Sequence, residues 1–235
     1  MKLLFPHATS DALNGVMLNT AGGITGGDRF GVSAHVAPGG HIVLTTQAAE
    51  RAYRAQPGEV AQVTNQLSVG NKARLDWLPQ ETLIYDRSAL RRSLTIDLAP
   101  EATVLAVEPV VFGRTEMGEV LNRIAFDDRI DVRRDGQLLF ADRTRLNGNA
   151  ASQLQRAAIG GGCGAMASVL LIADDAERYL APARAQMPAT GGVSLIRDGV
   201  LFARLLAVHG YTLRQTLVPL IELLGTNAIP RTWMI

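Results

Sequence analysis

The sequence predicts a mainly β protein in which β-hairpins stack in a helicoidal or sandwich-like arrangement, with two α-helices in a C-terminal α+β portion. Nearly every segment from about residue 16 to residue 146 alternates apolar and polar residues, as strands do. A short unit recurs within that stretch, and strands and helices mix after residue 160. Because 47% of the 235 residues are hydrophobic, we expect a single domain over residues 1–235, all-β over 1–150 and α+β over 160–235.

The recurring unit consists of an apolar residue, a turn and a strand. If His41, Ala73 and Ala102 occupy equivalent positions, the steps between copies are 32 and 29 residues. Steps of this size are typical of stacked repeats. Three weak copies also suit an ordinary β-sandwich, whose turns recur as well.

Two glycine pairs, Gly22-Gly23 and Gly26-Gly27, mark a sharply shaped loop between the first strands. A phosphate-binding loop would need Lys-Ser or Lys-Thr and a helix after the last glycine, whereas Asp28 and Arg29 precede a strand pattern over residues 30–36. A dinucleotide fingerprint fails for the same reason, because no helix N-terminus follows. On local evidence the segment is a bulged hairpin without chemistry.

The C-terminal part alternates strands and helices. We expect strands over residues 166–173, 193–196 and 200–208, and a helix that Asp174 caps and that ends near Met187. A second helix has its apolar residues at helical spacing, Gly225 at its C′ position and Pro219 bending its middle. This apolar stripe is a core face or, alternatively, a partner-binding face. Its members are Leu213, Leu217, Leu220, Ile221 and Leu224.

Composition limits the partners and the compartment. The 23 basic and 22 acidic residues leave a net charge of +1, which predicts neither a nucleic-acid nor a membrane partner. The basic pairs Arg91-Arg92 and Arg133-Arg134 are expected on solvated strand faces. The sequence shows neither a signal peptide nor an apolar run of membrane-spanning length, so we expect a cytoplasmic protein. The single Cys163 cannot form an internal disulfide and is expected to be a small buried residue.

Few side chains suggest catalysis, but several acids stand beside apolar strands or turns. The four histidines are scattered and no G-x-S-x-G occurs, so no enzyme class is supported. The acids are Asp28, Glu81, Glu108 and Asp142. Each could simply pair with an arginine, and for any single one that is the favoured interpretation. Together they could line a wet passage in which oxygen ligands hold a divalent cation loosely enough for transfer.

Five segments in order along the chain resemble the urease accessory protein D family (UreD). The resemblance covers essentially the whole chain. The segments are KLLFP at 2–6, LNTAGGITGGD at 18–28, TTQAAERAYR at 45–54, LDWLPQET at 75–82 and IPRTW at 229–233.

This resemblance implies a non-enzymatic urease maturation factor. It would bridge apo-urease and accessory protein F, which recruits the GTPase accessory protein G, and conduct Ni²⁺ from the GTPase to the urease active site through an internal passage. The family fold implied is a largely β, helix-like stack with two α-helices. No cofactor would be permanently bound, since Ni²⁺ is only in transit. A purely structural adaptor that does not contact metal, and a nucleotide- or phosphate-binding enzyme, are the alternatives.

The family's acidic passage positions carry over to Asp28, Glu108 and Asp142, while Glu50 and Glu81 lie inside strong motifs. Family members also have roughly thirty residues before the KLLFP segment, enough for two or three strands of about five to six residues each. We therefore expect the N-terminal strands of the family to be missing, with an unpaired edge or exposed core strip near residues 1–20.

Overall fold

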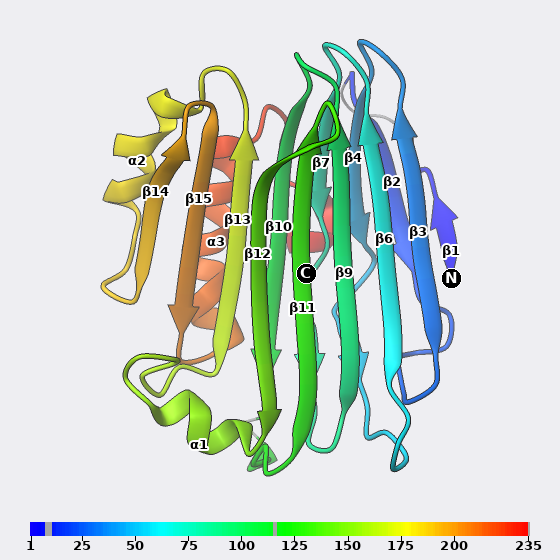
Figure 1. The fold of residues 1–235 in the computed structure, drawn as a ribbon, viewed down its shortest axis with the longest axis vertical. Coiled ribbons are helices and arrows are strands. Elements are labelled where there is room, and N and C mark those ends of the chain that lie inside the picture. Colours follow the sequence, from blue (N-terminus) through cyan, green and yellow to red (C-terminus); the bar gives the residue numbers. More distant parts are fainter. Residues whose placement is uncertain (8–10, 115–116, 235) are drawn as a thin grey trace.

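A computed structural model describes residues 1–7, 11–114 and 117–234, and this part of the chain forms two sheets that lie face to face (Figure 1). The large, ten-stranded sheet has the order β1 (Lys2–Leu4), β2 (Leu13–Leu18), β4 (His41–Thr46), β7 (Arg74–Leu78), β10 (Thr103–Phe112), β13 (Ala165–Ile172), β15 (Val200–Ala207) and β14 (Gly191–Arg197). Beside this path, β8 (Thr82–Ile84) pairs with β10, and β5 (Glu50–Ala52) pairs with β8. The small, five-stranded sheet has the order β12 (Gln137–Gly148), β11 (Ile124–Arg134), β9 (Ala89–Leu98), β6 (Ala61–Val69) and β3 (Arg29–Val36).

The chain coils between these sheets, so the mainly β, helicoidal stack is confirmed. β3, β6, β9 and β11 pair in parallel in the small sheet, and β4, β7 and β10 do so in the large sheet. The turns over residues 37–40, 70–73 and 99–102 carry the chain from one sheet to the other. Strands that flank one of these three turns therefore pair with neighbouring coils and not with each other, whereas β11–β12 and β14–β15 form the expected kind of antiparallel hairpin.

The repeat is confirmed with one shift of register. His41 pairs with Arg74, and Arg74 with Thr103. The first step is therefore 33 residues and not 32, whereas the second step of 29 is confirmed. The sequence comparison had matched His41, the first residue of its strand, with Ala73, the last residue of its turn. The turns have the same four-residue length, but their residue patterns differ, so the comparison was one residue out of register.

The glycine-rich segment links the two sheets, so the expectation of a bulged hairpin is wrong. β2 before it belongs to the large sheet and β3 after it to the small one. Ile24 pairs with the strand beside it, its N–H donating to Arg51 O at 2.7 Å. A Cβ on Gly23 would lie 2.2 Å from Cε2 of Tyr53, and one on Gly26 would lie 2.8 Å from the Cβ of Ala55. The glycines allow this close approach between chain segments.

The C-terminal helices cover the outer face of the large sheet. The longest, α3 (Gly210–Leu224), packs its predicted apolar stripe against β13 and β15, so this stripe is core (Figure 1). Pro219 lies inside α3. Gly225 ends the helix at φ −77°, where a Cβ would lie 2.9 Å from Ile221 O, so close approach and not a left-handed backbone favours glycine.

The helix predicted after Asp174 is divided. A 3-10 helix, η2 (Ala176–Tyr179), precedes α2 (Leu180–Ala185), and a second 3-10 helix, η3 (Arg231–Met234), lies near the C-terminus. Asp174 caps neither element, since the N-cap of η2 is Asp175 and it makes no side-chain capping bond. The sequence reasoning missed α1 (Ala150–Gln155), whose N-cap Asn149 accepts a hydrogen bond from Ser152 N at 2.8 Å.

β1 forms an edge of the large sheet and carries exposed apolar side chains. Leu3, Leu4 and Phe5 are about half exposed, as expected for residues 1–20. None of the helices in the described ranges is both long and apolar enough to cross a lipid bilayer.

Candidate functional site

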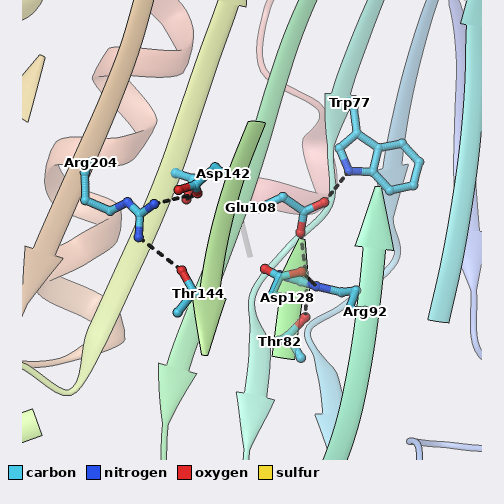
Figure 2. Close-up of polar contacts among 9 residues, drawn as sticks. Trp77, Thr82, Arg92, Glu108, Asp128, Asp142, Thr144 and Arg204 are labelled. Carbon is cyan, nitrogen blue, oxygen red and sulfur yellow. Dashed lines mark hydrogen bonds and ion pairs between the residues drawn. The ribbon is translucent and has the colours of Figure 1, made fainter. Parts of the chain in front are cut away.

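A row of polar side chains crosses the otherwise apolar space between the two sheets. On the large sheet, Glu108, Ser168 and Arg204 pair at one level of β10, β13 and β15. On the facing small sheet, Arg92, Asp128 and Thr144 pair at one level of β9, β11 and β12. Apolar clusters lie on either side of this row. We call the following residues the polar belt (Figure 2): Trp77, Thr82, Arg92, Glu108, Asp128, Asp142, Thr144, Ser168 and Arg204.

Strand alternation places these polar groups inside. In β9, Leu90, Arg92 and Leu94 point to the same side, so Arg92 takes a core position between two leucines. In β10, Glu108 shares its inward face with Val104, Ala106, Val110 and Phe112. The expectation that Arg92 lies on a solvated face is therefore wrong, because the alternation of β9 turns Arg91 outward and Arg92 inward.

Arg92 stands at the centre of the belt, between two carboxylates. Its Nε donates to Asp128 Oδ1 at 2.9 Å and its Nη2 to Asp128 Oδ2 at 2.6 Å. Its Nη1 donates to Thr82 Oγ1 at 2.8 Å and lies 2.8 Å from Glu108 Oε2. Trp77 Nε1 donates to Glu108 Oε1 at 2.7 Å (Figure 2). Arg92, Glu108 and Asp128 are all more than nine-tenths buried.

The two carboxylates compete for this one guanidinium. Glu108 Oε2 is within ion-pair distance of Arg92, yet among the described residues it has no partner in hydrogen-bonding geometry. Burial raises the pKa of Glu108 to about 7, an effect that Arg92 opposes and Asp128 reinforces. Burial also opposes the charge of Arg92, but Asp128 and Glu108 outweigh it and raise the pKa of Arg92. Arg92 therefore stays charged, and Glu108 is the group that titrates near neutrality.

Asp142 and Arg204 form the outer end of the belt, between β12 and β15. Arg204 Nη2 lies 2.5 Å from Asp142 Oδ2, and Nη1 donates to Thr144 Oγ1 at 3.2 Å. Ser168 Oγ donates weakly to Asp142 Oδ2 at 3.5 Å. A cavity of about 290 Å³ at this end is lined by residues that include Thr144 and Arg204, and also Cys163, which is buried as expected.

The opposite end of the belt opens toward the glycine-rich segment. A cavity of about 70 Å³ touches Trp77, Arg92 and Glu108 and reaches Glu50. A hollow of about 140 Å³, lined in part by Asn19, shares Glu50 with it. Asn19 Nδ2 donates to Glu50 Oε2 at 2.9 Å and holds this carboxylate at the mouth. Hollow, cavity and belt thus follow one another between the sheets.

The structure brings two of the three predicted site residues together. Glu108 lies at the centre of the belt and Asp142 at its outer end. Asp28 lies apart, since its Oδ2 accepts from Thr25 N at 2.8 Å and closes a turn of the glycine-rich segment. Asp28 lines none of the cavities described above. Its carboxylate also takes an N–H group that a phosphate would need there.

Glu81 is a structural partner. It is buried and pairs with Arg214 of α3, whose Nε lies 2.5 Å from Oε1 and whose Nη2 lies 2.9 Å from Oε2.

The sequence did not indicate Asp128, Arg92 and Arg204 as site residues. For Arg92 a signal was present, because it alternates with the inward-facing Leu90 and Leu94 in β9. No group of three or more His, Cys, Asp or Glu side chains able to hold a metal ion lies within the described ranges.

Three of the five segments quoted from the sequence, at 18–28, 45–54 and 75–82, line the cavities at the mouth of the belt, and the other two adjoin them. Lys2 pairs with Leu18, and Asn19 contacts Glu50. The segments at 45–54 and 75–82 join through Glu50 N and Glu81 O at 2.9 Å. The segment at 229–233 joins the same group, because the indole N–H of its last residue donates to Leu78 O at 3.0 Å.

Residues 1–234 match the protein family described as UreD urease accessory protein. Among similar proteins, "Urease accessory protein UreD" of Ruegeria pomeroyi is 50% identical over all of this chain and 91% of its own length. The protein of the same name from a second Ruegeria species is 48% identical over 99% of this chain and 81% of its own. "Urease accessory protein UreD 1" of Brucella abortus is 42% identical over 100% of this chain and 85% of its own.

Proposed function

The chain belongs to the UreD urease accessory protein family and so has a role in urease maturation, and from this premise we propose that it conducts Ni²⁺ along the polar belt. In this proposal it is a non-enzymatic scaffold that bridges apo-urease and accessory protein F. Ni²⁺ from the GTPase accessory protein G crosses it toward the urease active site. Nickel is the cargo, and no cofactor is held permanently.

One observation carries the proposal: three of the five segments with the family resemblance line the mouth of a polar belt that crosses the core. Polar groups are seldom placed inside a core without a role, because each buried charge needs a partner. The belt offers carboxylate and hydroxyl oxygens, which hold a borderline cation such as Ni²⁺ less firmly than Cys or clustered His would. Loose binding suits transfer.

A structural adaptor that does not contact metal is the second candidate, and the ion pairs favour it. Glu108 and Asp128 face Arg92, and Asp142 faces Arg204. An adaptor would need these pairs only to join the two sheets. The partners named above, accessory proteins F and G, rest on the family and not on the geometry of the belt.

Co-expression with urease and the other accessory proteins separates the two candidates. The variants are Glu108→Gln, Asp142→Asn and Asp28→Asn, with the outward-facing Asp127→Asn as the matched control. If the belt conducts nickel, Glu108→Gln and Asp142→Asn still assemble with urease but lower its activity and nickel content. Asp127→Asn also assembles with urease and leaves both its activity and its nickel content unchanged. Normal assembly with full activation in all variants would refute the passage and support the adaptor.

A further inference from the structure

We propose that Arg92 is a built-in counter-cation that closes the belt until a divalent cation takes its place between Glu108 and Asp128. This inference rests on the proposed function, because it explains how a cation passage can exist in a chain that folds without its cargo. It also assigns a role to Asp128, which the sequence did not suggest.

The contacts of Arg92 define the closed state. The guanidinium uses Nε and both Nη atoms on Asp128, Thr82 and Glu108, so it fills the space between the two carboxylates. Its side chain is only 7% exposed. A second cation cannot share this position, since like charges a few ångströms apart repel strongly in a low-dielectric interior.

The carboxylates are not fully satisfied by Arg92. Two acids face one guanidinium, and the buried Oε2 of Glu108 has no hydrogen-bond partner among the described residues. A divalent cation would balance both charges, which Arg92 alone does not. Without either cation, two uncompensated buried carboxylates would destabilise the fold. Arg92 therefore maintains the empty passage.

Arg92 has a place to move. The cavity of about 70 Å³ beside it is also lined by Asn65 and Glu50, which offer acceptor oxygens toward the mouth. The outer pair differs, because Arg204 is 31% exposed and can exchange its contact with Asp142 for water. The central pair is thus the point of closure.

Ni²⁺ binding to the purified chain at pH 7.5, measured by isothermal titration calorimetry with Ni²⁺ alone, tests the inference. Arg92→Gln should bind Ni²⁺ at least about tenfold more tightly than the wild type. Arg91→Gln, the adjacent outward-facing control, should match the wild type. Arg92→Gln/Asp128→Asn, which loses one charge of each sign, should lose the gain.

Folding is followed by near-ultraviolet circular dichroism. If Arg92→Gln is unfolded without metal, Ni²⁺ should restore its spectrum, while the double variant should fold without Ni²⁺. No gain in affinity in a folded Arg92→Gln, no rescue of an unfolded one, or a gain that survives in the double variant would each overturn the inference.

The urease test remains separate. Loss of urease activation in Glu108→Gln, with no gain in Ni²⁺ binding by Arg92→Gln, would refute the role of Arg92 and leave the passage intact. A gain in binding with full urease activation in Glu108→Gln would support the cation site and refute the passage.

Discussion

We expect Glu108→Gln to remove a pH dependence from the stability of the chain. Burial raises the pKa of Glu108 from 4.5 to about 7. Between these values the folded state holds a proton that the unfolded state has lost, so the free energy of unfolding falls as pH rises. The favourable contribution is complete below pH 4.5 and is lost once the pH passes 7.

The shift sets the size of the effect. A rise in the pKa of Glu108 from 4.5 to about 7 limits the effect on the free energy of unfolding to about 3 kcal/mol, most of which falls between pH 5 and pH 8. Glutamine has one carbonyl oxygen where glutamate has two acceptors, so the variant loses a contact with Trp77 or Arg92. That loss is the same at every pH.

Urea unfolding at pH 5, 6, 7 and 8 measures the difference. The free energy of unfolding of the wild type, less that of Glu108→Gln, should fall by about 2 to 3 kcal/mol over this range. Glu222→Gln, on the exposed face of α3, should follow the wild type. A wild-type to Glu108→Gln difference constant within about 0.5 kcal/mol would refute the assigned titration.

Three further predictions test the packing described above by chemical unfolding, and the last of them also by proteolysis. Gly23→Ala should destabilise the chain by about 1 to 3 kcal/mol because its Cβ would overlap Tyr53, whereas Gly192→Ala, where no atom lies within 4 Å, should change stability by less than about 0.5 kcal/mol; equal effects would contradict the steric reason. Leu217→Ala in α3, fully buried, should cost about 2 to 5 kcal/mol, and a loss below about 1 kcal/mol would show that the helix does not form a core face. Arg214→Met should cost about 1 to 3 kcal/mol by leaving Glu81 unpaired, and should speed proteolysis near residues 231–234 because Arg214 Nη1 also donates to Trp233 O; unchanged cleavage would show that this contact does not hold the segment.

Local periodicity was sufficient for the strands and for α3, because alternation and helical spacing are properties of neighbouring residues. Local periodicity did not predict which strands pair, because a four-residue turn connects two strands of one hairpin as readily as two strands of different sheets. Arg92 was missed because two adjacent arginines are typical of a solvated strand face, unless it is known which residues of the strand point into the core. Glu108 was found because an acid in an apolar run is conspicuous, whereas the bond from Thr25 N to Asp28 depends on the fold of the loop.

The pairing of Arg92 with Asp128 across β9 and β11 has a consequence for how the coils align. A one-residue slip of either strand would turn its apolar side chains outward, but a two-residue slip would keep every side chain on its own face. Leu90 and Leu94 lie opposite Phe126 and Ile130. After such a slip Arg92 would face Phe126 or Ile130 and Asp128 would face one of the two leucines, and each unpaired buried charge costs about 3 to 5 kcal/mol. The charged pair thus fixes the register in which a strand of one coil pairs with a strand of the next. An apolar interior alone would allow more than one such register.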